Sequence, residues 1–200
     1  MDYQQKKLNL GIDIDGVIAD SVNTFLNYLN KMFNKNFKYE DIKEYRFENI
    51  YKVSEKEMEY FTKKFTEEKG WLKLEPFPDA KKFLDEIKEY FNIYIITSRP
   101  KELTEEMTYK WLEKNKIYYD KIFFMENDCK YLTAKKYNIN LNYFIEDCLE
   151  IALNISQYIP VFVLKTPYNF QEKLINENII YVNKHAEIYK YFIEKQIIKK

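Results

Sequence analysis

The chain of 200 residues carries 32 basic and 32 acidic side chains, so its formal net charge is zero. This balance argues against a basic nucleic-acid surface or an acidic tail as the main feature of the protein, and we expect no stable nucleic-acid partner. With 46% hydrophobic residues the chain can bury a substantial core, and its length fits one domain with an insertion. The N-terminus has only a short apolar stretch followed by acids, so we expect no signal peptide, no membrane span and a cytoplasmic location.

Several residue types that carry common chemistries are scarce. Cys129 and Cys148 lack the spacing of a zinc site and are predicted to be plain thiols. The single histidine, His185, has no neighbour of a catalytic pair and is predicted to be a surface or capping residue. The three glycines do not form a G-x-G-x-x-G or P-loop motif, which excludes these two ways of binding phosphate. Any catalysis must therefore rest on carboxylates, hydroxyls and lysines.

The first predicted strand is the run LNLGIDID at residues 8–15, after which the stretch from about residue 20 to 75 has helical periodicity. The segment 21–33 places five apolar residues on one helical stripe, namely Val22, Phe25, Leu26, Leu29 and Phe33. A second stripe contains Met58, Phe61 and Phe65. Ser54 and Glu57 form a capping box before it, and Gly70 fits just beyond its end. We expect a small helical insertion above the carboxyl-terminal edge of the sheet, as a candidate lid.

From residue 76 onward, strand-like and helix-like segments alternate, which is typical of a parallel sheet covered on both faces. The predicted strands are 92–97, 121–125, 142–146, 161–164 and 179–182, and the predicted helices include 79–90, 102–115 and 149–157. The predicted fold class is α/β: a Rossmann-like parallel sheet of about six strands with helices on both faces, plus a small helical cap inserted after the first strand. Residues 1–20 and 76–200 would form the core, and residues 21–75 the cap.

Asp13 and Asp15 stand at the end of the first predicted strand, within the segment GIDIDGVIADS. Side chains at positions i and i+2 of a strand point to the same side, so both carboxylates would face one spot unless the chain turns between them. A divalent cation would offset their repulsion, since Mg²⁺ binds carboxylate and carbonyl oxygens. The alternative is an ordinary Asp-Gly turn at a strand end.

Two further strand ends carry polar side chains. Thr97 and Ser98 follow one apolar run, where hydroxyls and backbone N–H groups can hold phosphate oxygens or simply cap a turn before Pro100. Glu146 and Asp147 follow another. Two acids at a second strand end of the same sheet favour a metal shared with the first pair.

These motifs, in this order, resemble the haloacid dehalogenase superfamily of phosphohydrolases. The pattern is D-I-D-G-V after an apolar run, a strand ending in Thr or Ser, a lysine, and a strand ending in two acids. The segments GIDIDGVIADS, ITSRP, TYKWLEKNKIYYDKIFF, FIEDC and KTPYN resemble more narrowly the cytosolic 5′(3′)-deoxyribonucleotidases and their bacterial nucleotidase relatives.

The resemblance implies a role for each acid. Asp13 would be the nucleophile that forms an aspartyl-phosphate. Asp15 would protonate the leaving alkoxide and later deprotonate the attacking water, and its backbone carbonyl would bind Mg²⁺. Glu146 and Asp147 would complete the metal site with Asp13 and Asp15, and the sequence leaves open which of the two binds the ion directly.

The resemblance also implies a set of groups that bind the phosphoryl moiety. Thr97 would hold a phosphoryl oxygen, with help from Ser98. Lys130 would neutralise the phosphoryl group and the nucleophile, with three competing lysines, which are Lys121, Lys135 and Lys136.

The predicted function is a Mg²⁺-dependent phosphomonoesterase that hydrolyses a nucleoside monophosphate, a small-molecule substrate. The alternatives are a haloacid dehalogenase, a phosphomutase, a phosphatase of sugar phosphates or polynucleotide 3′-ends, and a non-catalytic regulator that binds a phosphorylated ligand. Phe25, Tyr45 and Phe47 are candidates to stack on a base, or else are core aromatics. Arg46 has no predicted place near phosphate, and a homodimer is left open.

Overall fold

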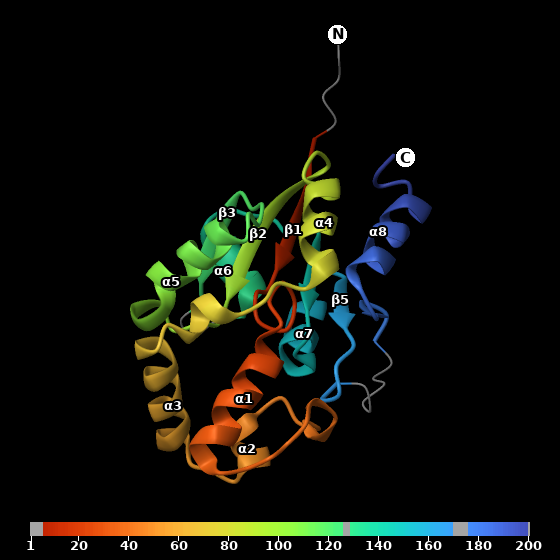
Figure 1. Cartoon of the computed structure of the whole chain (residues 1–200). Helices are drawn as coiled ribbons and strands as arrows, with labels where there is room; N and C mark the ends of the chain where they lie inside the picture. Colours follow the sequence, from red (N-terminus) through yellow and green to blue (C-terminus); the bar gives the residue numbers. More distant parts are fainter. Residues whose placement is uncertain (1–5, 126–128, 170–175, 200) are drawn as a thin grey trace.

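The computed structural model describes residues 6–125, 129–169 and 176–199 (Figure 1). Six strands form one sheet: β1 (Leu8–Ile12), β2 (Phe91–Thr97), β3 (Lys121–Phe124), β4 (Tyr143–Glu146), β5 (Val161–Leu164) and β6 (Ile179–Val182). The helices of the described parts are α1 (Ser21–Phe33), α2 (Phe47–Tyr51), α3 (Glu55–Glu67), α4 (Pro78–Ile87), α5 (Lys101–Lys114), α6 (Lys130–Lys136), α7 (Leu149–Ser156) and α8 (His185–Glu194). Two short 3₁₀ turns are η1 (Tyr39–Asp41) and η2 (Gly70–Lys73). None of the described helices combines the length and apolarity needed to cross a membrane.

The sheet has the strand order β3-β2-β1-β4-β5-β6, and every pair of neighbours is parallel. This confirms the predicted α/β class with a parallel sheet of six strands. The order reverses between β1 and β4, because the chain moves outward in opposite directions from these two strands. In open α/β sheets, ligands bind at such a reversal, outside the carboxyl ends of the strands.

Alternate residues along each strand face two separate cores, as the period of two in a strand requires. Ile12, Ile95 and Phe162 belong to a core shared with residues of α4, α5 and α8. Phe144 and Val163 face the other side and pack with residues of α6 and α7. Burial on both faces explains why these strands read as nearly continuous apolar runs.

Residues 21–75, which the structure describes throughout, contain α1, α2, α3 and the two 3₁₀ turns, and no strand. They lie at the carboxyl-terminal edge of the sheet (Figure 1). The two connections to the rest of the chain run side by side, with the N–H of Asp20 donating to Glu75 O at 2.8 Å and that of Phe77 to Ile18 O at 2.8 Å. The predicted capping box is confirmed: Ser54 and Glu57 each bind the other's backbone N–H at the start of α3.

Gly70 does not cap α3, contrary to the prediction. Lys69 takes the left-handed conformation there, with φ of 55°. Gly70 is buried at the start of η2, where a Cβ would lie 2.4 Å from Cδ2 of the Phe65 ring. A glycine is therefore required by close packing rather than by backbone conformation.

His185 is buried rather than at the surface, because it is 1% exposed at the first position of α8. Its backbone N–H donates to Asp79 Oδ2 at 2.9 Å, and its Nδ1 lies 3.3 Å from Asp79 Oδ1. Asp79, on α4, thus acts as the capping group, and the histidine ring fills the space between α8 and Phe83, 5.5 Å away between ring centroids.

We expect Gly70→Ala to lower the free energy of unfolding by about 1–3 kcal/mol, because the added methyl group overpacks the buried Phe65 ring. Lys69→Gly is the matched control: it relieves a left-handed residue and should leave stability equal or higher. Denaturant unfolding of both variants measures this. A Gly70→Ala protein as stable as the parent would contradict the packing argument.

Candidate active site

Three buried carboxylates meet at the carboxyl ends of β1 and β4. Asp13 follows β1, and its N–H continues the ladder by donating to Ile145 O at 3.1 Å. Glu146 ends β4 and Asp147 follows it. One oxygen from each of the three carboxylates lies within 4.8 Å of the others. Because β1 and β4 are neighbours in register, two segments far apart in the sequence deliver their acids to one place.

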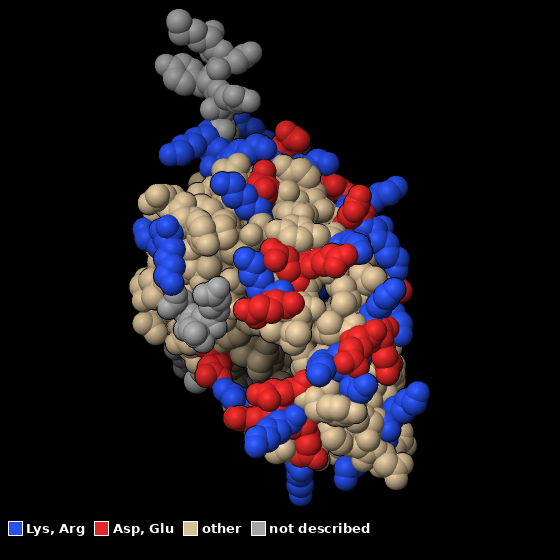
Figure 2. All heavy atoms as spheres, turned by 90° about the vertical axis from the view of Figure 1, so that its left-hand side faces the viewer, with Lys and Arg blue, Asp and Glu red and all other residues tan. Residues whose placement is uncertain are grey.

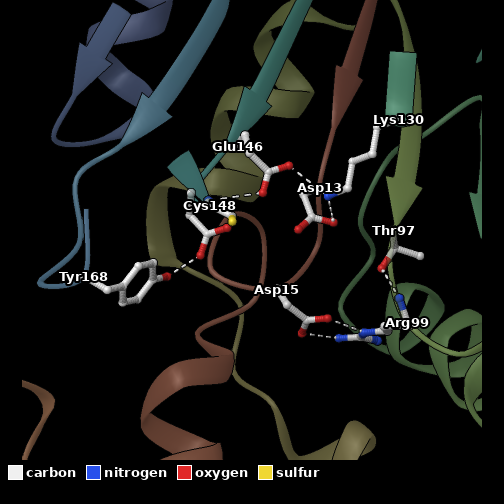
Figure 3. A network of polar contacts seen from close by, with 9 residues as sticks. Asp13, Asp15, Thr97, Arg99, Lys130, Glu146, Cys148 and Tyr168 are labelled. Carbon is white, nitrogen blue, oxygen red and sulfur yellow. Dashed lines mark hydrogen bonds and ion pairs between the residues drawn. The ribbon is translucent and has the colours of Figure 1, made fainter. Parts of the chain in front are cut away.

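A single lysine lies among these acids. Lys130 is fully buried, with Nζ 2.9 Å from Asp13 Oδ1 and 2.8 Å from Glu146 Oε2 (Figure 3). It is the first residue of α6, which therefore aims its amino-terminal end at the site. The three competing lysines, Lys121, Lys135 and Lys136, are exposed.

The charges of the cluster are unbalanced. Burial raises the pKa of Asp13 to about 7, although Lys130 opposes the rise. The pKa of Asp147 is raised well above its usual value by burial, with Glu146 and Asp13 adding to the rise. Burial works against a charge on Lys130, yet the two carboxylates beside it raise its pKa, so it stays protonated. Further positive charge at this point would be strongly favoured.

The carboxylate oxygens fit a divalent cation. Both oxygens of Glu146 are engaged, one by Lys130 and the other by the N–H of Cys148 at 3.2 Å. Asp147 Oδ2 accepts from the hydroxyl of Tyr168, but its Oδ1 is buried without a hydrogen-bond partner among the described residues. An orphaned buried carboxylate oxygen beside two further acids is the kind of donor set that hard cations use.

The Asp15 carboxylate does not lie with the other acids, so the expectation that it faces the same spot as Asp13 is not met. The i, i+2 rule holds only while a strand continues, and β1 ends at Ile12. The chain turns over residues 14–19, with Gly16 at φ of 74°. The Asp15 carboxylate is thereby directed to Arg99, whose Nε and Nη2 donate to it at 2.7 and 2.8 Å (Figure 3).

Thr97 and Ser98 lie at the end of β2. Thr97 is buried, and its Oγ1 accepts from the N–H of Arg99 at 3.2 Å, so it shapes the turn as the capping alternative predicts. Its hydroxyl proton remains available to a ligand. Ser98 is exposed, and its side chain makes no hydrogen bond that would fix it at the site among the described residues.

Sequence reasoning missed the residues that support the acids. Arg99, which binds the Asp15 carboxylate, has no role predicted from the sequence. Tyr168 binds Asp147, and Asn169 donates to Asp147 O at 2.7 Å and Leu164 O at 2.8 Å. Both stand in KTPYN, directly after β5, so a polar segment at another strand end of the same sheet edge was the available signal.

A cavity of about 420 Å³ lies between Asp15 and Asp147 on one side and residues of the segment 21–75 on the other. Asp15 and Asp147 line one part of it, and the aromatic rings of Phe25, Phe61 and Trp71 line another. Phe25 also packs edge-on against four rings, at 5.2 to 6.3 Å between centroids, as the core alternative predicts.

Two other residues, Arg46 and Cys148, lie at the rim of this cavity or in its wall. Arg46 is mostly exposed at the rim, with its guanidinium 3.9 Å from both Glu48 and Glu150. Cys148 also lines the cavity, but burial raises the pKa of its thiol to about 12, which leaves it protonated and unreactive.

A buried carboxylate beside a lysine, at the switch point of a parallel sheet, is the arrangement expected of phosphoryl transfer. The chain matches the family model "5' nucleotidase, deoxy (Pyrimidine), cytosolic type C protein" over residues 6–169. The chain belongs to this nucleotidase family. As a nucleotidase, it is a hydrolase of phosphoric monoester bonds, and the resemblance to the haloacid dehalogenase superfamily is confirmed.

Relatives and solved structures agree with this membership. The nucleotidase is 34% identical to the "Putative nucleotidase YqfW" of Bacillus subtilis, over 90% of this chain and 91% of the relative. A haloacid dehalogenase-like hydrolase from Streptococcus pneumoniae has the same fold, with a TM-score of 0.70 at 17% identity, covering 93% of this chain and 98% of that one. YfnB of Bacillus subtilis, solved with magnesium bound, gives a TM-score of 0.58 at 14% identity, covering 93% and 99%.

We expect Lys130→Met to lower the free energy of unfolding by about 3–5 kcal/mol, because it leaves buried carboxylates without their cation. Lys135→Met, on the same helix but exposed, removes a hydrogen bond to Asn140 and a cation–π contact with Tyr131, and should change stability by less than about 1 kcal/mol. Both are measured by denaturant unfolding with a chelator present. Equal effects of the two changes would show that the buried lysine does not offset the acids.

Proposed function

We propose that the protein is a Mg²⁺-dependent phosphomonoesterase that works through an aspartyl-phosphate on Asp13 and hydrolyses nucleoside monophosphates. The observation that carries the proposal is the buried cluster of Asp13, Lys130, Glu146 and Asp147, which adjoins a cavity at the switch point of the sheet. Hydrolysis of phosphate monoesters has a very high uncatalysed barrier, and charge and positioning supply most of its catalysis.

In the first step, a carboxylate oxygen of Asp13 attacks phosphorus while the bond from phosphorus to the leaving oxygen breaks. The electron pair of that bond moves to the leaving oxygen, which takes a proton from the Asp15 carboxyl group. Lys130 lies 2.9 Å from the nucleophile and neutralises the negative charge gathered there. Thr97 offers its hydroxyl, and Ser98 its side chain, to the phosphoryl oxygens.

In the second step, water attacks the phosphorus of the aspartyl-phosphate, and Asp15, now a carboxylate, takes a proton from that water. The bond between phosphorus and Asp13 breaks, which releases phosphate and restores the carboxylate. Two neighbouring aspartates can hold these different roles because their surroundings differ: Asp13 faces Lys130 and two acids, and Asp15 faces Arg99 at the cavity wall.

Mg²⁺, when bound, would supply a Lewis acid that polarises the phosphoryl group and offsets its charge. Asp13 and Asp147 would hold it through carboxylate oxygens, and Asp15 through its backbone carbonyl. Glu146, engaged by Lys130 and Cys148, would support the ion indirectly. Gly16 allows the turn to approach, since a Cβ there would lie 1.8 Å from Asp147 Oδ2. YfnB, the structural neighbour solved with magnesium, supports the choice of metal.

The cavity supports a substrate larger than phosphate alone. Its volume of about 420 Å³ lies within the usual range for small-molecule sites, and its wall combines aromatic rings with a few charged groups. A nucleoside has both an apolar base and polar sugar hydroxyls. The family description and the name of the Bacillus subtilis relative support a nucleotide. In this proposal residues 1–20 and 76–200 form the catalytic core of a cytoplasmic enzyme, and residues 21–75 form a cap over the strand ends.

We expect Asp13→Asn to lower phosphate release from nucleoside monophosphates by about 10⁴-fold or more, because a carboxamide is a poor nucleophile. Asp85→Asn, on the exposed side of α4, should leave the rate unchanged. The measurement is release of inorganic phosphate in the presence of Mg²⁺, over a panel of nucleotides, sugar phosphates and oligonucleotide ends. Full activity of the Asp13→Asn protein would reject the assignment.

The covalent intermediate can be tested separately. Reduction of an acyl phosphate by borohydride yields an alcohol, so trapping during turnover should convert residue 13 to homoserine, detected by peptide mass spectrometry. Conversion of another acidic residue, with none at position 13, would show that the other residue is the nucleophile.

We expect Asp147→Asn to weaken Mg²⁺ binding at least about tenfold, because it removes the charge of the carboxylate with the orphaned oxygen. The amide oxygen still accepts from Tyr168, so the fold is preserved. Calorimetric titration of Mg²⁺ measures the affinity, with Asp85→Asn as the control. Unchanged affinity in Asp147→Asn would place the ion elsewhere.

A further inference from the structure

Arg99 forms a two-pronged ion pair with Asp15. Its side chain is 1% exposed, whereas that of Asp15 is 22% exposed and lies in the cavity wall. Nε donates to Asp15 Oδ2 at 2.7 Å, and Nη2 donates to Oδ1 at 2.8 Å (Figure 3). Two parallel hydrogen bonds from a planar fork fix the orientation of a carboxylate as well as its position.

The guanidinium is itself held from several sides. Its Nη1 donates to Thr108 Oγ1, on α5, at 3.1 Å. Its Cζ lies 4.7 Å from the ring centroid of Trp71 and 5.9 Å from that of Trp111. The rings are anchored in turn, since the indole N–H of Trp111 donates to Leu74 O at 2.7 Å. Arg99 is thus a rigid part of the core, while the group it binds faces the cavity.

This arrangement matters because Asp15 follows the end of β1, in a turn rather than in the sheet. Nothing in the sheet ladder fixes its side-chain torsions, and an aspartate in a turn has several rotamers open to it. The fork of Arg99 selects one of them. A general acid misplaced by about 1 Å loses on the order of 10²-fold in rate, so a fixed rotamer has a direct kinetic value.

We propose that Arg99 is a positioning residue whose fork holds the Asp15 carboxyl group at the cavity wall, in line to give its proton to the leaving oxygen. The inference rests on the proposed function. As the phosphoryl group transfers to Asp13, the bond from phosphorus to the leaving oxygen breaks and its electron pair stays on that oxygen. The proton of Asp15 then moves to the same oxygen. The carboxylate that results keeps both hydrogen bonds to Arg99, so the group stays in place for the second step.

The test compares leaving groups that do and do not need a proton. Arg99→Lys keeps the charge but loses the fork. We expect its kcat/KM for phenyl phosphate, a poor leaving group, to fall about 10²-fold, and that for 2,4-dinitrophenyl phosphate to stay within about threefold. Lys110→Gln, which removes an exposed ion pair on α5, is the control and should change neither value. Equal losses on both substrates would mean a merely structural role and overturn the inference.

Two further variants keep the test decisive if Arg99→Lys does not fold. Thr108→Val keeps the branched shape but removes the acceptor of Nη1, and it should show a smaller loss confined to phenyl phosphate. A double-variant cycle adds Arg99→Lys or Thr108→Val to Asp15→Asn. Because Arg99 acts through Asp15, the double variant should be no slower on phenyl phosphate than Asp15→Asn alone, and a further tenfold loss would overturn the inference. A parent protein that releases no phosphate from the nucleotide panel would instead reject the proposed function.

Discussion

The site depends on one buried ammonium group. Three carboxylates at the ends of β1 and β4 repel one another, and their burial removes the water that would screen them. Lys130 offsets part of this cost by contacting both Asp13 and Glu146. One positive charge against three acids leaves a surplus of negative charge in a closed space. A bound cation would therefore stabilise the site. The unfavourable free energy of burying the three acids is offset by the apolar packing of the two cores on either side of the sheet.

The turn after β1 gives two neighbouring aspartates different partners. Asp13 remains on the strand axis and faces Lys130, whereas Asp15 turns toward Arg99. Gly16 makes this difference possible, because its positive φ and missing Cβ let the turn pass close to Asp147.

On the face shown in Figure 2, basic and acidic side chains are interspersed. The strongest charge effects therefore arise inside the site, where burial rather than the net charge of the protein sets them.

The sheet was predictable because most of its strands are buried on both faces and bounded by polar turns. The apolar runs mark five of the strands to within one residue, whereas the first predicted run, 8–15, extends three residues beyond the end of β1. The acids at the strand ends were predictable for the same reason. The direction of Asp15 was not, since the strand rule fails once the chain turns. Choosing Lys130 among four lysines needed the family resemblance, because burial of one lysine leaves no local signal. Arg99 and Gly70 owe their roles to tertiary contacts with Asp15 and Phe65, which no local pattern encodes.

The region of residues 21–75 shares part of its buried core with the sheet. Phe65 and Trp71 belong to the same buried cluster as Ile12 and Ile95 of the sheet, so part of the core is common to both regions. The connections of this region pair as two short antiparallel segments beside Ala19 and Pro76. Trp71 stands close to the second of these and stacks on Arg99, which holds Asp15. Leu74 of the same region accepts from the indole N–H of Trp111, which also flanks Arg99. A displacement of residues 21–75 would therefore reach Asp15 through the residues packed around Arg99, whereas Asp13 is held by its hydrogen bond to Ile145 in the ladder between β1 and β4.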